Sequence, residues 1–207
     1  MRLSHLGDFE FIGDLSLQDA DVLAKYAKKS KLILEFGVGG STQIFAQSLP
    51  EYLLSVETST DWIKRTQEKL AMIENKTNPV FCDYDSILYH IQNKLFDLIF
   101  VDGIDYLRPD FAARTWNFLV PGGVMIFHDT RREGDFVNLC NLATKHFNEI
   151  KRIEVNEAGS NDVASNISVI HKKVKEDYVN WNWVENKPLW AYGGEPMPVG
   201  AKLWRQQ

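Results

Sequence analysis

The sequence predicts an α/β domain in which helices cover both faces of a doubly wound parallel sheet. Short apolar runs alternate with amphipathic stretches, and each run ends on an acid or a glycine. The runs are also almost continuously apolar, as expected of parallel strands that are buried on both faces. They lie at 31–37, 52–57, 79–83, 96–102 and 123–129.

The same alternation predicts the helices, at 16–29, 41–49, 59–75, 85–94, 109–119 and 134–148. Ser16 is a suitable N-cap for the first helix, with Asp19 three residues later. After residue 150 the pattern changes. The segments IKRIEV (150–155) and NISVIHKK (166–173) are expected to pair as closing strands, with NEAGSND (156–162) in the turn between them.

Length and composition are those of one soluble globular domain. The chain has 207 residues, and its net charge of −5 gives no reason to expect a nucleic-acid-binding surface. No apolar run is long enough to cross a bilayer, and the acidic first fourteen residues do not resemble a signal peptide. Cys82 and Cys140 lack metal-type spacing, so we expect reduced thiols in a cytoplasmic protein.

A glycine-rich turn after the first apolar run is the strongest functional signal. Gly37, Gly39 and Gly40 follow the pattern of a dinucleotide-binding loop, but Thr42 stands where its third glycine belongs. Glu35 lies two residues before the loop, where its carboxylate would repel a pyrophosphate. A cationic ligand such as S-adenosylmethionine suits it better. The alternative is an ordinary glycine-rich turn, with Glu35 as a cap or a solvated acid.

Acids at the ends of the next two runs support a nucleoside ligand. Glu57 ends the second run, about 20 residues after the loop, where Rossmann-like sheets place an acid that binds the ribose hydroxyls. Asp83 ends the third run and could meet the adenine amino group. It could equally cap the helix expected at 85–94.

These motifs resemble those of class I S-adenosylmethionine-dependent methyltransferases. The segments that carry the resemblance are ILEFGVGGST, SVETS, FDLIFVDG and LVPGGVMIFHDT. The nearest group is the metal-associated O-methyltransferase-like branch, with catechol, caffeoyl-CoA and macrolide-sugar methyltransferases. The resemblance covers residues 15–172 and implies a Rossmann-like, seven-stranded sheet in the order 3-2-1-4-5-7-6, with strand 7 antiparallel. We expect cofactor-binding residues at Glu35, Gly37, Gly39, Gly40, Ser41, Glu57, Asp83 and Asp102.

A second group of polar residues follows two strands that the resemblance makes neighbours. Asp102 ends one, and His128 and Asp129 end the other, so the three side chains should meet at the carboxyl edge of the sheet. Together they could bind a divalent ion, Mg²⁺ or Mn²⁺. Similar enzymes carry an acid pair or Asp-Asn where this chain has His128, Asp129 and Thr130. The alternative is that Asp102 contacts the cofactor loop and Asp129 is a cap.

Methyl transfer to oxygen needs a group that takes the acceptor proton. Related sugar methyltransferases place a catalytic histidine three residues after the strand-end acid, and this chain has Asp105 there. Asp105 is therefore one candidate base, although it could instead be a helix-start acid near Arg108 and Pro109. His128 is the other candidate base, because imidazole titrates in the useful range.

The last stretch has no clear period and forms a separate expectation. Residues 1–173 are expected to form the domain and 174–207 a tryptophan-rich extension that packs on the domain or on a partner subunit of a homo-oligomer. Its four tryptophans are Trp181, Trp183, Trp190 and Trp204.

The function expected from these features is methyl transfer from S-adenosylmethionine to a hydroxyl group of a small molecule. One alternative is a non-catalytic cofactor-binding or scaffold protein of the same fold. Another is an NAD-dependent oxidoreductase, which Glu35 and the missing third glycine disfavour.

Overall fold

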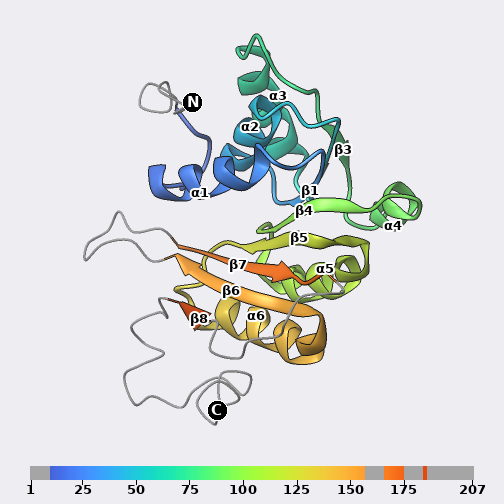
Figure 1. Cartoon of the computed structure of the whole chain (residues 1–207). Coiled ribbons are helices and arrows are strands. Elements are labelled where there is room, and N and C mark those ends of the chain that lie inside the picture. The colour runs from blue at the N-terminus through green and yellow to red at the C-terminus, as the bar shows by residue number, and fades with distance from the viewer. Residues whose placement is uncertain (1–9, 157–165, 175–183, 186–207) are drawn as a thin grey trace.

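The structure, a computed structural model, describes residues 10–156, 166–174 and 184–185. Its centre is a sheet with strand order β3-β2-β1-β4-β5-β7-β6-β8 (Figure 1). The strands are β1 Leu32–Phe36, β2 Tyr52–Val56, β3 Val80–Cys82, β4 Phe96–Val101, β5 Leu119–Phe127, β6 Ile150–Asn156, β7 Ile167–Lys172 and β8 Val184–Glu185.

The predicted order of seven strands is confirmed. Strands β3, β2, β1, β4 and β5 run parallel, and β7 lies antiparallel between β5 and β6. The two-residue β8 comes from the tryptophan-rich stretch and pairs in parallel with β6, which extends the sheet beyond the prediction. The turn expected at 156–162 and the four tryptophans of the tail lie outside the described residues, apart from Asn156, which ends β6.

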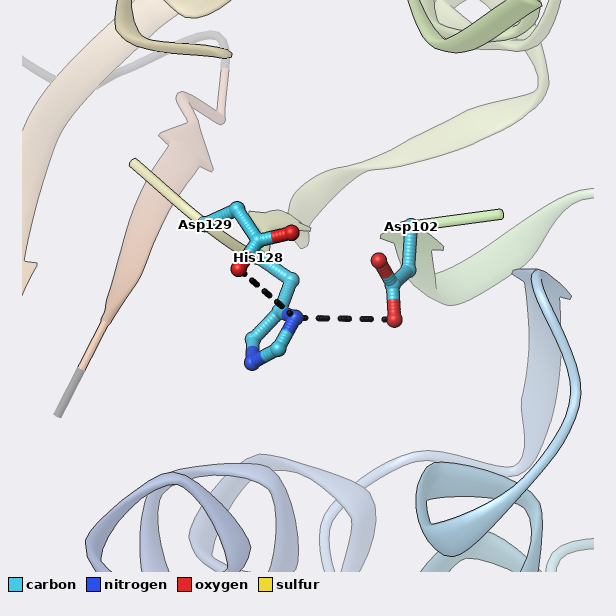
Figure 2. Close-up of side chains that lie close together, drawn as sticks. All are labelled: Asp102, His128 and Asp129. Atoms are coloured by element: carbon cyan, nitrogen blue, oxygen red, sulfur yellow. Dashed lines mark ion pairs between the residues drawn. The ribbon is translucent and has the colours of Figure 1, made fainter. Parts of the chain in front are cut away.

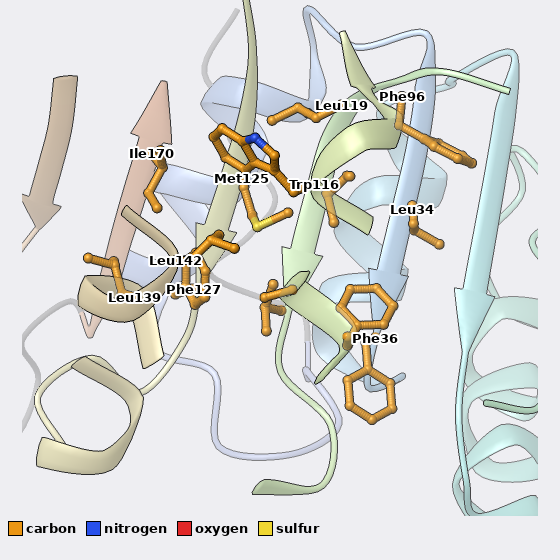
Figure 3. Packing of buried hydrophobic residues seen from close by; sticks show 14 of the residues in the cluster. Leu34, Phe36, Phe96, Trp116, Leu119, Met125, Phe127, Leu139, Leu142 and Ile170 are labelled. Carbon is orange, nitrogen blue, oxygen red and sulfur yellow. The ribbon is translucent and has the colours of Figure 1, made fainter. Parts of the chain in front are cut away.

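Helices cover both faces of the sheet because successive strand residues point to opposite sides. Ile33 packs beneath α1, α2 and α3, whereas Leu34 and Phe36 pack against the layer formed by α4, α5 and α6. Figure 3 shows Leu139 and Leu142 of α6 against β5 and β7 in this second layer. The helices are α1 Leu17–Ala27, α2 Gly40–Gln47, α3 Thr60–Ala71, α4 Ile87–Ile91, α5 Arg108–Thr115 and α6 Glu133–Lys145.

Some element boundaries differ from the sequence prediction. Strand β5 begins at Leu119 rather than at 123, because Leu119 already pairs with Phe96 before a register irregularity in the β4–β5 ladder. Consequently α5 ends at Thr115, earlier than expected. The predicted N-cap of α1 is confirmed, since the Oγ atom of Ser16 accepts the backbone N–H of Asp19 at 3.1 Å.

None of the helices in the described part of the chain is long and apolar enough to span a membrane.

A buried carboxylate joins α1 to the antiparallel part of the sheet. Glu154 on β6 accepts the Tyr26 hydroxyl of α1 at 2.5 Å and lies 3.1 Å from Nε2 of His171 on β7. Arg152 also pairs with it. The hydrogen bond with His171, reinforced by that from Tyr26, lowers the pKa of Glu154 to about 2 in spite of its burial. The ionised carboxylate therefore belongs to the folded state.

We expect Glu154→Gln to lower the free energy of unfolding at neutral pH by about 1.5–3 kcal/mol, the usual worth of hydrogen bonds to a charged group. Because folding lowers this pKa, the contribution is present above pH 4.5 and is lost as the pH falls toward 2. Urea denaturation across this range should therefore give a flatter pH profile for the variant. The matched control is Glu68→Gln on the exposed face of α3. Equal slopes for wild type and Glu154→Gln would contradict the expectation.

Candidate active site

A cavity of about 430 Å³ lies at the carboxyl edge of the parallel strands. The loops that follow β1, β2, β4 and β5 line it, together with residues 12–15 ahead of α1. The strand order reverses between β1 and β4, and open α/β sheets bind ligands at such a switch point. The volume lies within the range of small-molecule sites. This cavity is therefore the candidate ligand site.

The glycine loop lines the cavity, but its backbone amides already have partners. Four consecutive amides donate to acceptors within the protein: Gly37 to the Val56 carbonyl (3.0 Å), Val38 to Oε2 of Glu57 (3.1 Å), Gly39 to Oγ1 of Thr42 (2.9 Å) and Gly40 to the Ile12 carbonyl (2.8 Å). A phosphate-binding loop instead points such amides at its ligand. This loop therefore supplies shape rather than free N–H donors.

Glycine is required at position 37 because two turns touch there. Gly37 has a φ of +90°, and a Cβ atom added to it would lie 2.2 Å from the backbone nitrogen of Gly103, which follows β4. Gly103 in turn lies against the ring of Phe36, where an added Cβ would be 2.8 Å away. The turns after β1 and β4 are thus held in direct contact.

Glu35 lies beneath the glycine loop and is not among the residues that line the cavity in the described structure. Its side chain is fully buried and accepts hydrogen bonds from Ser55 Oγ at 2.6 Å and Ser41 Oγ at 3.0 Å. Burial raises the pKa of Glu35 to about 7, although these hydrogen bonds act in the opposite direction. Glu35 therefore contacts the loop through Ser41, and its predicted role toward a cationic ligand stays a prediction.

The other predicted cofactor residues divide between the cavity wall and the surface. Gly37, Gly39, Gly40, Ser41, Glu57 and Asp102 line the cavity. Asp83 does not line it in the described structure: its Oδ1 accepts the backbone N–H of Ser86 at 2.8 Å, which is the capping role considered as the alternative.

Glu57 lies at the end of β2 with both oxygens engaged by the backbone. Its Oε1 accepts the N–H groups of Thr58 (2.7 Å) and Ser59 (2.9 Å), and its Oε2 accepts that of Val38. A carboxylate offers about four acceptor positions. Oε2 therefore keeps capacity for a further donor at the cavity wall.

The expected convergence of Asp102, His128 and Asp129 is confirmed (Figure 2). Nδ1 of His128 lies 3.5 Å from Oδ2 of Asp102 and 3.6 Å from Oδ1 of Asp129. Asp129 has a positive φ of 59°, which aspartate tolerates better than most residues. One ligand atom from each of the three residues falls within a 4.8 Å cluster.

The surroundings of His128 favour its charged form. Burial alone would lower its pKa, but the carboxylates of Asp102, Asp19 and Asp129, which lie 3.5–3.8 Å from its ring nitrogens, raise the pKa of His128 to about 10. Its Nε2 atom has no hydrogen-bond partner among the described residues, although Oδ2 of Asp19 lies 3.8 Å away. These carboxylates therefore favour the imidazolium, which donates a proton and does not accept one, and the role of His128 as a general base stays a prediction.

Asp105, the other candidate base, points away from the cavity. Its side chain is 70% exposed and pairs with Nη2 of Arg132 at 3.1 Å and Nη2 of Arg108 at 3.3 Å. It is not part of the cavity wall formed by the described residues. The structure therefore brings Asp102, His128 and Asp129 together and leaves Asp105 at the rim of a charged network.

Arg108, which begins α5, is the site residue that the sequence analysis missed. Its guanidinium group is buried and lies 2.8 Å from Asp102, 3.0 Å from Asp129 and 2.9 Å from Asp135. A cation in the first turn of a helix interacts unfavourably with the helix dipole. This unfavourable placement is the local signal by which the sequence could have indicated a special role for Arg108. The sequence analysis also did not identify residues 12–15 and Trp62 as part of the cavity wall.

A second, smaller cavity of about 170 Å³ adjoins the first. The two cavities share Asp14 and His128. The rest of its lining is polar: Ser16, Asp19, Asp129, Arg131 and Asn166. His128 thus borders both spaces.

Comparison with known proteins is consistent with this geometry. Residues 34–130, from β1 to the end of the acid cluster, match the sequence model of a family described as "Methyltransferase domain". The class I resemblance inferred from the sequence motifs is thereby confirmed. No curated protein matches the chain.

Solved structures share the fold of this methyltransferase domain at low sequence identity. The O-methyltransferase TomG from Streptomyces achromogenes, solved with SAM, has a TM-score of 0.63 and 15% identity over 78% of this chain and 82% of its own. An O-methyltransferase from Bacillus cereus, solved with SAH, has a TM-score of 0.60 and 20% identity over 77% and 83%. The N-methyltransferase NodS from Bradyrhizobium japonicum has a TM-score of 0.54 and 17% identity over 74% and 85%.

Replacing Gly37 tests the contact between the two turns. We expect Gly37→Ala to destabilise the fold by at least about 2 kcal/mol, through its positive φ and the clash with Gly103. The matched control is Gly134→Ala at the start of α6, where an added Cβ meets nothing within 4 Å; it should stabilise by about 0.5–1 kcal/mol. Denaturant titration measures both. Equal stabilities of wild type and Gly37→Ala would show that the turns can separate freely.

Proposed function

We propose that this protein transfers a methyl group from S-adenosylmethionine to a hydroxyl group of a polar small molecule. The observation that carries the proposal is the cavity at the strand-order switch point of a methyltransferase domain, with Glu57, Asp102 and His128 on its wall. When bound there, S-adenosylmethionine supplies an electrophilic methyl group.

The free acceptor capacity of Glu57 Oε2 supports a role in binding ribose hydroxyls. The glycine loop and Ser41 would form the wall beside the amino-acid end of the cofactor. Trp62 lies on the same wall and offers an aromatic face, and Arg65 lies over its ring with its Cζ atom 4.6 Å from the centroid. These contacts suit a nucleoside with no phosphate groups.

The hydrogen bonds that the loop amides already make argue against a nicotinamide cofactor, the alternative to S-adenosylmethionine. A dinucleotide carries a pyrophosphate that needs free N–H donors at the start of the helix. In this chain the amides of residues 37–40 all donate to protein acceptors. Binding NAD there would require these hydrogen bonds to break. The Glu35 carboxylate lies under the loop and does not line the cavity, so it does not itself exclude a pyrophosphate.

We place the acceptor in the smaller cavity, on the other side of His128 from the cofactor. Its lining supports a polar acceptor, and Nε2 of His128, which lies 3.8 Å from Oδ2 of Asp19 and has no hydrogen-bond partner among the described residues, is a donor beside it. Asp102 lines the larger cavity, and its Oδ2 lies 3.5 Å from Nδ1 of His128, which borders both cavities, whereas Asp105 lines neither. We therefore assign proton acceptance to Asp102, from an acceptor hydroxyl held where the two cavities meet at His128. A hydroxyl acceptor is in keeping with TomG and the Bacillus cereus protein, which are O-methyltransferases. NodS is an N-methyltransferase, so amines are the alternative acceptors to test.

The cofactor assignment predicts selective binding. S-adenosylhomocysteine at 100 times its dissociation constant should raise the free energy of unfolding by about 2.7 kcal/mol. NAD at the same concentration should give no shift. Thermal denaturation with each ligand, followed by calorimetry, makes the comparison. Stabilisation by NAD but not by S-adenosylhomocysteine would reverse the assignment, and no response to either would remove the cofactor site.

Glu57→Ala should weaken S-adenosylhomocysteine binding about 10- to 100-fold, because hydrogen bonds to a charged group contribute about 1.5–3 kcal/mol. Glu51→Ala is the matched control, since Glu51 precedes the same strand at its other end and pairs with Lys31 on the surface. Its affinity should equal that of wild type. Calorimetric titration of both variants decides between a binding role and general destabilisation.

Turnover separates an enzyme from a cofactor-binding scaffold. Formation of S-adenosylhomocysteine should be followed with phenols, sugars and amines as acceptors. The proposal expects it with hydroxyl compounds. Cofactor binding with no turnover on any class would favour the scaffold, and turnover on amines alone would move the acceptor atom to nitrogen.

A further inference from the structure

We propose that the guanidinium group of Arg108 takes the place of a divalent metal ion between Asp102 and Asp129, so that this site works without a resident metal. The proposal concerns the edge of the sheet where methyl transfer is proposed, and its consequence for catalysis rests on that proposed function. Its geometry and its test are independent of any cofactor.

Arg108 bridges Asp102 and Asp129 through the carboxylate oxygens opposite to those that lie near His128. Nη2 donates to Oδ1 of Asp102 and Nη1 to Oδ2 of Asp129, while Nη1 also donates to Oδ1 of Asp135. Nε and Nη2 donate to the Gly103 carbonyl at 3.1 and 3.0 Å. Arginine keeps its charge in proteins, and its planar fork suits paired carboxylates. The site therefore contains a permanent, oriented cation.

Both carboxylate oxygens of Asp129 already have partners within the protein. Its Oδ2 receives both Arg108 and Nη2 of Arg132, the latter at 2.8 Å. Its Oδ1 receives Nδ2 of Asn166 at 2.9 Å and faces Nδ1 of His128 at 3.6 Å. Arg108, Arg132 and Asn166 take three of the four positions that a carboxylate offers, and the His128 imidazole lies at the fourth, beyond hydrogen-bond length. A metal ion would have to displace at least one of them.

His128, the third residue expected to bind a metal ion, also makes a different contact. Nδ1 of His128 lies between Oδ2 of Asp102 and Oδ1 of Asp129, at 3.5 and 3.6 Å, which is the position of a donor shared by two carboxylates (Figure 2). A metal-bound imidazole nitrogen must instead direct a lone pair at the ion. The three residues cluster closely enough for a metal, but as arranged they bind Arg108 and each other.

The position of Arg108 in its helix supports a role in the site. It is the first residue of α5, where a cation is unfavourable, and its side chain is only 6% exposed. Local helix energetics therefore do not explain a buried arginine here. The carboxylates from the ends of β4 and β5 do, together with Asp135 in the first turn of α6.

This arrangement widens the class of acceptor that the site can take. A resident ion selects acceptors that chelate it through two neighbouring oxygens. Without one, the site has no such requirement, so an acceptor with a single hydroxyl is sufficient. Arg108 does not touch the acceptor in this account; it is a positioning residue that fixes Asp102 and Asp129.

Manganese binding tests the proposal without any need for activity. Mn²⁺ is titrated into wild type, Arg108→Met and Arg108→Met/Asp129→Asn, with electron paramagnetic resonance or calorimetry as the readout. Wild type should show no saturable site up to about 1 mM. Arg108→Met removes the cation and should gain a site that binds at least about tenfold more tightly, because two carboxylates lose their counter-ion. The second substitution should abolish that gain.

Controls distinguish the site from general charge effects. Arg114→Met removes an exposed cation of the same helix, paired with Asp110, and should gain no Mn²⁺ site. Arg108→Lys keeps the positive charge and should also gain none. A wild-type Mn²⁺ site that Asp129→Asn removes would overturn the proposal, as would a folded Arg108→Met that binds no ion.

If Arg108→Met does not fold, the wild-type titration decides alone: no saturable site supports the proposal, and a site lost in Asp129→Asn overturns it. S-adenosylhomocysteine binding, measured on the same wild-type sample, separates a failure of the proposed function from a failure of this inference.

Discussion

The contact between the turns that follow β1 and β4 organises the whole carboxyl edge of the sheet. Gly37 and Gly103 approach so closely that neither has room for a side chain, and Phe36 packs against Gly103 from below. The Gly103 carbonyl then accepts two donors of Arg108. A single chain of contacts thus runs from the central strand to the guanidinium group. Through it, the glycine loop and the acid cluster are held in a fixed relation on either side of the cavity.

The charged network beside the cavity orients the side chains of the site more than it stabilises the fold. Burying a guanidinium group and several carboxylates carries a desolvation penalty that good geometry only offsets. Here Arg108 satisfies one oxygen each of Asp102, Asp129 and Asp135, and Arg132 adds further contacts to Asp129 and Asp135. Such a network has few alternative arrangements. Asp102 therefore reaches the cavity wall in a defined orientation, which a proton acceptor requires.

The two cavities provide separate places for the methyl donor and the acceptor of the proposed reaction. The larger lies over the glycine loop and Glu57, where a nucleoside fits, and the smaller has a polar lining between α1 and the end of β5. His128 borders both and is the natural meeting point of donor and acceptor. The hydrogen bonds of the amides of residues 37–40 and the partners of the acid cluster both support the proposals made for this edge, a nucleoside ligand without phosphate and a site without a resident metal.

The sequence determined much of the fold, because its signals are local. Strand and helix periodicity predicted the alternating elements, and the family motifs supplied their order. The meeting of Asp102, His128 and Asp129 could also be predicted, since the carboxyl ends of neighbouring parallel strands share one edge. The cytoplasmic location, the association of the tail and the oligomeric state stay predictions.

Only the tertiary structure decided what those residues contact. Glu35 occupies a strand position that faces α2, so Ser41 and Ser55 surround it beneath the loop. The Ile12 carbonyl, 28 residues before the amide it accepts, fills the place of a ligand at the start of α2. Arg108 belongs by sequence to a helix start, yet it joins carboxylates from three different elements. Periodicity and motif spacing fix the direction in which a backbone runs. The partner of a long, charged side chain depends on which segments fold next to it, and that is a property of the assembled domain alone.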